Sequence, residues 1–212
     1  ALQVLHDRGI GIDSSISFFM PAHWSLVPNL HLISFRDLLQ HTSGIRDVSG
    51  SCDNADELTY DVTKMRISDG ILESDHGIPC YQNVNFALFR ILIPYLMGHT
   101  YPGNDTDDAT QTAIWYRDYV IQNVLVPSAV YNVDLKPWDS YPTLAYPYPY
   151  LSFNGKDPGD WTLIAGGGGW YMSALDVNRI LTTLLYTSHL LPAQTRQEML
   201  DSGLGVQHAD LG

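Results

Sequence analysis

One apolar segment limits the folds open to this chain more than any other feature. From Val84 to Met97 all but three residues are apolar, and a helix that is apolar on every side must be buried on every side. The segment is shorter than the roughly 20 residues that a membrane span needs, and it contains Arg90. It therefore predicts a buried core helix, with a kink or an early end at Pro94 and Gly98 as its stop.

Helical patterns recur along the rest of the chain, so we expect a mainly helical structure. Ser34 and Ser173 each have an aspartate three residues later, which is the pattern of a reciprocal N-terminal cap. Thr106 is the expected cap of another helix, and Gly44 supplies a left-handed stop for the helix that Ser34 begins. The predicted helical segments are residues 1–8, 33–45, 60–73, 84–97, 106–126, 174–187 and 191–200.

The charge balance excludes one class of partner. The chain carries 23 acidic and 11 basic residues, a net charge of -12, whereas nucleic-acid binding depends on lysine and arginine against phosphate. The eight histidines are scattered, and no two have the i, i+4 spacing of a metalloprotease helix. We therefore predict neither a metal nor another cofactor. The glycines at 166–169 lack the Lys-Ser/Thr of a phosphate loop, and they indicate backbone that approaches another element closely.

The two cysteines predict the compartment. Cys52 and Cys80 both lie in expected loops, and we predict that they form a disulfide, which persists in oxidising compartments. The glycosylation sequon at Asn104 is also typical of an exported protein. Together these features predict a secreted or periplasmic protein without a membrane span. The chain begins with the last turns of a helix and ends without completing a pattern, so we expect residues 1–212 to be the central part of a longer domain.

Two features remain that could carry chemistry. The aromatic stretch of residues 136–161 either stacks on sugar rings or packs down as a long loop on its own aromatic side chains. Tyr81 and Asn83 stand at the start of the apolar helix. Asn83 is either a helix cap or an amide that holds a substrate carbonyl. Tyr81 either covers the helix end or accepts a proton, and the second role requires a nearby cation that lowers its pKa.

Several segments, taken in order, resemble the serine β-lactamase and DD-peptidase superfamily, in its class C and related esterase branch. Residues 1–21 resemble the helix and turn that follow the family's nucleophile. Residues 33–47 resemble the segment that contains His-Thr-Ser-Gly, and residues 81–89 resemble the Tyr-x-Asn motif with the helix it opens. Residues 98–102 and 116–130 are similar to the next helical pair, although the family's usual Pro-Leu-Gly-Met reads Pro-Ser-Ala-Val at residues 127–130. Residues 165–181 are similar to a Gly-Gly segment with a Ser and Asp helix start.

This resemblance implies an α/β fold of the β-lactamase/transpeptidase type, of which residues 1–212 are chiefly the helical part and most sheet strands lie outside. It implies Tyr81 as general base or proton relay, and Asn83 as the hydrogen-bond partner of the substrate's acyl-side carbonyl or amide. The family's other two motifs are missing. No lysine of this chain has a serine three residues before it, and no Lys-Thr-Gly or His-x-Gly follows the last helix. We expect these motifs before Ala1 and after Gly212.

The resemblance thus predicts a serine hydrolase of the β-lactamase/penicillin-binding-protein type. It would transfer an acyl group from an ester or amide, in a small molecule or peptide, through an acyl-enzyme. With one motif of three, this chain is expected to be inactive without complementing segments of the same fold. Two alternatives stay open: a catalytically inactive homologue or fragment that acts as a binding protein, and a sugar-binding module.

Overall fold

The computed structural model describes residues 1–53, 56–137, 143–146 and 155–206, and in these residues the fold is helical. The α-helices are α1 (Leu2–Arg8), α2 (Phe35–Gln40), α3 (Tyr60–Asp69), α4 (Asn83–Ala87), α5 (Phe89–Leu96), α6 (Asp105–Val120), α7 (Ala174–Tyr186) and α8 (Ala193–Asp201). Within the described residues β-structure is limited to isolated bridges, such as the one between Ser15 and Ser34. This agrees with the prediction of a helical part, and none of the helices in these ranges is long and apolar enough to cross a membrane.

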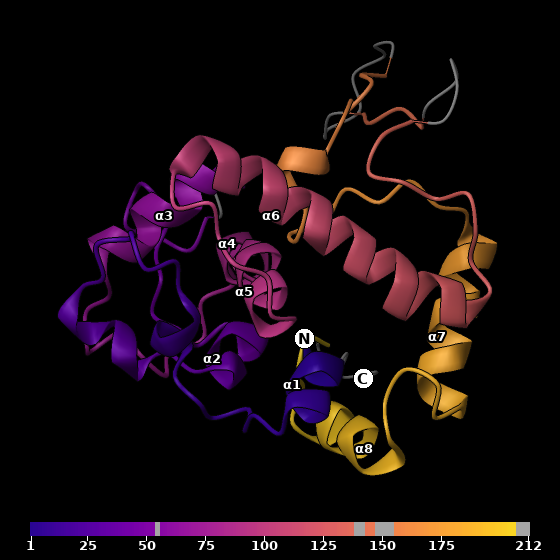
Figure 1. The fold of residues 1–212 in the computed structure, drawn as a ribbon, viewed down its shortest axis with the longest axis horizontal. Coiled ribbons are helices and arrows are strands. Elements are labelled where there is room, and N and C mark those ends of the chain that lie inside the picture. The colour runs from indigo at the N-terminus through magenta and orange to yellow at the C-terminus, as the bar shows by residue number, and fades with distance from the viewer. Residues whose placement is uncertain (54–55, 138–142, 147–154, 207–212) are drawn as a thin grey trace.

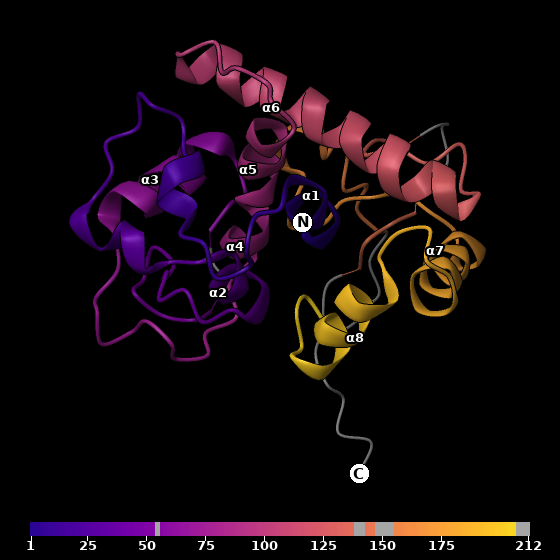
Figure 2. The same cartoon turned by 60° about the horizontal axis from the view of Figure 1, so that its bottom comes forward.

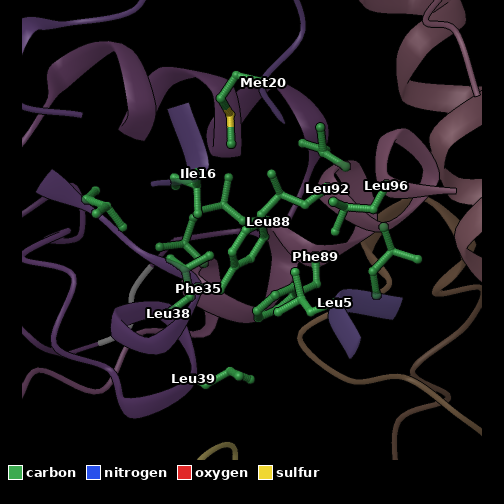
Figure 3. Close-up of a cluster of buried hydrophobic side chains, with 14 of the residues drawn as sticks. Leu5, Ile16, Met20, Phe35, Leu38, Leu39, Leu88, Phe89, Leu92 and Leu96 are labelled. Atoms are coloured by element: carbon green, nitrogen blue, oxygen red, sulfur yellow. The ribbon is translucent and has the colours of Figure 1, made fainter. Parts of the chain in front are cut away.

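Helices α4 and α5 form the centre of the fold (Figure 1). The longest helix, α6, packs against α5, which also contacts α1 and the 3-10 turn Ile16–Phe19. Helix α3 lies on one side of this centre, whereas α7 and α8 lie on the other (Figures 1 and 2). The core gathers on the central helix pair, where Leu88, Phe89 and Leu92 meet Leu5 of α1 and Phe35 of α2 (Figure 3).

The apolar segment is confirmed as the buried core, and its helix continues past the proline. Helices α4 and α5 meet at Leu88, whose backbone (φ −58°, ψ −31°) and hydrogen bonds to Val84 and Leu92 are themselves helical. Pro94 lies inside α5, which ends at Leu96. Only two residues of α5 follow Pro94. The backbone hydrogen bond that Pro94 cannot donate is therefore lost from the last turn of the helix only. Gly98 follows with a positive φ of 91°, which agrees with its predicted role as the stop.

The charged residue inside this segment is also buried. Arg90 is 1% exposed, and burial lowers the pKa of its guanidinium to about 10. Its Nη1 donates a hydrogen bond to the carbonyl of Leu163, whereas Nε and Nη2 have no partner among the described residues. Arg90 therefore ties α5 to the segment that leads into the four glycines.

Two of the predicted caps are present, and a third is at a different residue. The side chains of Ser34 and Ser173 each form a reciprocal capping box with the aspartate three positions later. The N-cap of α6 is Asn104 and not Thr106, because Asn104 accepts a hydrogen bond from the backbone N–H of Asp107 at 3.0 Å. Asparagine is the better cap, and it places the start of the helix two residues earlier than a cap at Thr106 would.

The left-handed stop of α2 is His41 and not Gly44. His41 has a φ of 57°, and its backbone N–H and that of Thr42 return to carbonyls of the last turn. Histidine is among the few residues that adopt this conformation. Gly44 also has a positive φ of 80°, but it lies in the following loop, where a Cβ atom would stand 3.1 Å from the backbone nitrogen of His76.

The aromatic stretch lies partly outside the described residues. Of its described part, residues 143–146 and 155–156 meet in an isolated bridge between Ala145 and Lys156. A short 3-10 turn, Thr162–Ile164, follows the stretch. The described part contains no α-helix, as the lack of a helical period predicts.

Candidate functional site

Tyr81 and Asn83 lie together at the start of α4. The Tyr81 hydroxyl donates a hydrogen bond to Oδ1 of Asn83 at 3.1 Å, and the tyrosine is 46% exposed. Asn83 is the first helical residue and Gln82 occupies the N-cap position, where no side chain caps the helix. The interpretation of Asn83 as a helix cap is therefore wrong. Its amide instead stands beside the tyrosine hydroxyl.

The ring of Tyr81 packs on His41, the residue that ends α2. The two ring centroids are 4.3 Å apart with an interplanar angle of 37°, and Phe86 meets the same imidazole edge-on at 4.5 Å. His41 comes from the His-Thr-Ser-Gly segment, more than 35 residues before the tyrosine in the chain. Two segments of the sequence thus form one aromatic cluster.

Hydrogen bonds hold these two segments together. The backbone N–H of Cys80 donates to the carbonyl of His41 at 2.8 Å, and the N–H of Gln82 donates to His41 Nδ1 at 3.2 Å. Asn85 is fully buried and lies between them: its Nδ2 is 3.1 Å from His41 Nδ1, and its Oδ1 accepts from Ser43 Oγ at 2.7 Å. The position of Tyr81 is therefore set by the loop after α2 as well as by its own helix.

The surroundings of His41 favour the neutral imidazole over the charged one. Burial lowers its pKa below the usual value of 6.5, because a charged ring loses more hydration than a neutral one. A proton-accepting tyrosine needs a cation close by. His41 does not supply that charge, and no basic side chain of the described ranges hydrogen-bonds to Tyr81.

A disulfide next to Tyr81 joins its segment to the loop that contains Cys52. Cys52 and Cys80 are bonded, with their Cα atoms 5.5 Å apart, which confirms the predicted pairing. The adjacent Gln82 is fully buried and donates from Nε2 to the carbonyl of Ser51 at 2.9 Å. The disulfide and this hydrogen bond therefore attach the loop of Ser51 and Cys52 to both neighbours of Tyr81, Cys80 and Gln82.

The glycine segment lies directly against α4, as the prediction of close backbone approach requires. A Cβ atom at Gly166 would stand 2.9 Å from the carbonyl oxygen of Phe86, and one at Gly167 would stand 3.4 Å from that of Asn83. Gly166 also has a φ of 109°, a conformation that side chains oppose. The absence of side chains lets this segment support the helix that carries Asn83.

An open pocket of about 660 Å³ adjoins the aromatic cluster. Its lining includes His41, Tyr81 and Phe86 together with Ser202 and Gly203, which follow α8. The half-exposed tyrosine and the edge of the imidazole thus border a space large enough for a small molecule.

Asn104 is exposed at the start of α6, and its Nδ2 donates to a carboxylate oxygen of Asp107 at 2.9 Å. The ranges that the structure describes contain no group of three or more His, Cys, Asp or Glu that could hold a metal. The end of the aromatic stretch contributes Trp161 to a second pocket of about 320 Å³, together with Trp170 and Tyr171.

Sequence reasoning assigned no role to His41, Gln82 or Asn85. His41 belongs to the His-Thr-Ser-Gly segment on which the family resemblance rests, so the sequence marks it as a residue of interest. The sequence does not show that it packs on Tyr81 or hydrogen-bonds to Asn85. Gln82 and Asn85 are polar residues next to or inside an apolar run, and buried polar groups require partners. That rule predicts that each has a hydrogen-bond partner, but it does not say which.

A protein-family model described as Beta-lactamase matches residues 1–211. None of the curated protein sequences matches the chain. Among solved structures, FmtA from Staphylococcus aureus is 20% identical with a TM-score of 0.67. The match covers 94% of this chain and 52% of FmtA. A penicillin-binding protein from Bacillus halodurans is 20% identical with a TM-score of 0.61, and the match covers 94% of this chain and 60% of that protein. The D-amino acid amidase from Ochrobactrum anthropi SV3 is 16% identical with a TM-score of 0.62, and the match covers 93% of this chain and 55% of the amidase.

The structural similarities show the fold, and the chain spans about half to three fifths of the length of these proteins. Since the family model covers almost every residue, this chain belongs to the Beta-lactamase family.

Proposed function

We propose that this protein is a serine hydrolase that transfers an acyl group from an ester or amide through an acyl-enzyme. Tyr81 is the general base or proton relay, and Asn83 binds the acyl-side carbonyl or amide of the substrate. The observation that carries the proposal is the placement of the Tyr81 hydroxyl, 3.1 Å from the Asn83 amide and beside a pocket of about 660 Å³.

The chemistry requires a nucleophile that residues 1–212 do not provide. In the proposed reaction a serine oxygen bonds to the carbonyl carbon, and its proton passes to the phenolate form of Tyr81. The bond to the leaving group then breaks as the proton is transferred to that group, and water later cleaves the acyl ester. No Ser-x-x-Lys occurs in this chain, so the serine and the cation that activates Tyr81 come from sequence outside it.

The serines of the described site do not fit the nucleophilic role. Ser43 is 1% exposed and donates its hydroxyl proton to Asn85. Ser202 borders the pocket, but no lysine follows it at the family spacing. The site therefore offers a relay and an amide, which act on a nucleophile held by another segment of the same fold.

Covalent labelling tests the proposal directly. The protein is expressed with the sequence that its gene encodes on either side of residues 1–212, and is treated with a fluorescent penicillin and a fluorophosphonate probe. We expect one labelled serine, identified by mass spectrometry, outside residues 1–212. The 212-residue chain alone should neither be labelled nor hydrolyse nitrocefin or p-nitrophenyl esters. A labelled serine such as Ser43 or Ser173, or an intact protein that neither probe labels, would contradict the proposed mechanism.

Reversible penicillin binding and retention on a polysaccharide resin separate the two alternatives. An inactive homologue would bind a penicillin reversibly, without a covalent adduct. A sugar-binding module would use the pocket of Trp161, Trp170 and Tyr171, since aromatic faces stack on sugar rings, and would be retained on a polysaccharide resin. The Cys52–Cys80 disulfide supports a secreted or periplasmic location for either protein.

A further inference from the structure

The hydrogen bonds of His41 determine which of its ring nitrogens carries the proton. The backbone N–H of Gln82 points to Nδ1 at 3.2 Å, and a backbone N–H can only donate. Nδ1 must therefore be the acceptor, and the hydrogen of the neutral ring lies on Nε2. This assignment does not depend on the orientation of any side-chain amide.

Asn85 strengthens the same assignment. Its Oδ1 accepts the hydroxyl proton of Ser43 at 2.7 Å, so the Nδ2 group is the end that faces His41 Nδ1 at 3.1 Å. Two N–H donors thus converge on one ring nitrogen. Protonation of Nδ1 would place a third N–H against both of them, and the imidazole is for this reason held neutral as well as in one tautomer.

The other ring nitrogen of His41, Nε2, is left for a ligand. His41 Nε2 forms no hydrogen bond within the described residues, and it is not among the buried polar atoms that lack a partner there. The rings of Tyr81 and Phe86 pack on the imidazole, and all three residues border the pocket of about 660 Å³. His41 is 9% exposed and lines this space, so Nε2–H is the ring donor left for a ligand there.

We propose that His41 is a substrate-binding residue whose Nε2–H, fixed by Gln82 and Asn85, donates a hydrogen bond to a carbonyl oxygen of an amide or ester in the pocket. The assignment of the ligand as an amide or ester rests on the proposed function. A neutral, pre-oriented donor suits an uncharged carbonyl, because it need not lose a shell of strongly bound water before it binds.

The backbone of His41 restricts the variants that can test this role. Its φ is 57°, a left-handed conformation that asparagine also adopts readily. In His41→Asn the side-chain oxygen can replace Nδ1 as the acceptor for Gln82, but nothing replaces Nε2–H. His41→Gln is the matched variant, since its longer amide reaches the position of Nε2 while the acceptor at Nδ1 is lost.

The first measurement is the tautomer, which does not depend on turnover. The protein, expressed with its encoded flanking sequence, is labelled with ¹⁵N-histidine, and long-range ¹H–¹⁵N spectra are recorded across a pH series. His41→Asn assigns the resonances of His41. We expect a protonated Nε2 and an unprotonated Nδ1 at neutral pH, with protonation of the ring only below the usual range. A protonated Nδ1 at neutral pH would overturn the proposal.

The second measurement is the binding of N-acetyl-D-phenylalaninamide, whose two carbonyls are uncharged acceptors. We expect the His41 Nε2 resonance to shift on binding, and His41→Asn to weaken binding by about 2- to 10-fold, the loss of one hydrogen bond. His41→Gln should bind more tightly than His41→Asn although it is the less stable variant. An unchanged Kd in His41→Asn, or no binding to the wild-type protein, would overturn the proposal. Failure of covalent labelling alone would contradict the proposed acyl-enzyme and leave both of these measurements valid.

Discussion

The Tyr81 hydroxyl donates to the Asn83 side chain across 3.1 Å, although the two residues are separated by Gln82. This contact exists because Gln82 has an extended backbone, with φ of −137° and ψ of 122°. In extended backbone, side chains two residues apart point the same way and the one between them points oppositely. Gln82 is accordingly fully buried, while Tyr81 is half-exposed at the pocket and Asn83 is partly exposed.

Replacing Tyr81 by phenylalanine should separate its hydroxyl from its ring. The ring contact with His41 survives in Tyr81→Phe, so the melting temperature should stay nearly constant. Loss of general acid–base catalysis should lower kcat by roughly 10²- to 10⁴-fold. Steady-state hydrolysis and thermal unfolding of the protein with its encoded flanking sequence check both parts. Full activity in the variant would show that Tyr81 has only a packing role.

Replacing Asn83 should affect catalysis more than stability. Because Asn83 is not the N-cap, Asn83→Ala should not show the typical cap loss of about 1 kcal/mol. Asn83→Asp is the matched variant, since its carboxylate still accepts from Tyr81 but has no N–H for a substrate carbonyl. We expect both variants to lose turnover. If only Asn83→Ala is impaired, Asn83 acts by orienting Tyr81 and not by binding substrate.

The disulfide should contribute to stability as well as to the site. In the chain-entropy model, a bridge that spans 28 residues contributes about 3 to 4 kcal/mol. The double variant Cys52→Ser, Cys80→Ser should therefore unfold at lower denaturant concentration than the wild type, and dithiothreitol should shift only the wild type. Free-thiol titration of the denatured, unreduced protein should find none. Two reactive thiols would contradict the bridge.

Substitutions in the glycine segment should differ according to what a new Cβ meets. In Gly166→Ala it would lie 2.9 Å from backbone oxygen, at a strained positive φ, so we expect a loss of roughly 1 to 3 kcal/mol. Gly11→Ala is the control, since its nearest contact is an ordinary 3.6 Å. Chemical denaturation of the two variants makes the comparison. Equal stability would show that the segment does not press on α4.

Stability should depend on pH through His41. Its pKa is lowered in the folded protein by burial, so below about pH 6.5 the unfolded chain binds a proton that the native chain does not. The free energy of unfolding should therefore fall as the pH drops below that value. His41→Asn should lack this part of the decrease, and the difference between the two pH profiles isolates it from other groups. Parallel profiles would place the histidine pKa at its usual value.

The sequence by itself determined the features that depend on neighbours in the chain. The capping boxes at Ser34 and Ser173 follow from a serine and an aspartate three residues apart, which meet in any helix start. The burial of the apolar segment follows from its composition alone. The disulfide followed because the chain has only two cysteines. Each of these rules needs no knowledge of where the rest of the chain lies.

Only the tertiary structure decided where helices α2 and α5 end and what surrounds Tyr81. Local chemistry favoured a kink or an early end at Pro94 and a stop at Gly44, but α5 continues to Leu96 and the stop of α2 is His41. Asn85 lies more than 40 residues beyond the histidine that it contacts. Such contacts leave no periodic pattern in the sequence, because they arise when packed helices bring distant polar groups together and burial requires each group to find a partner.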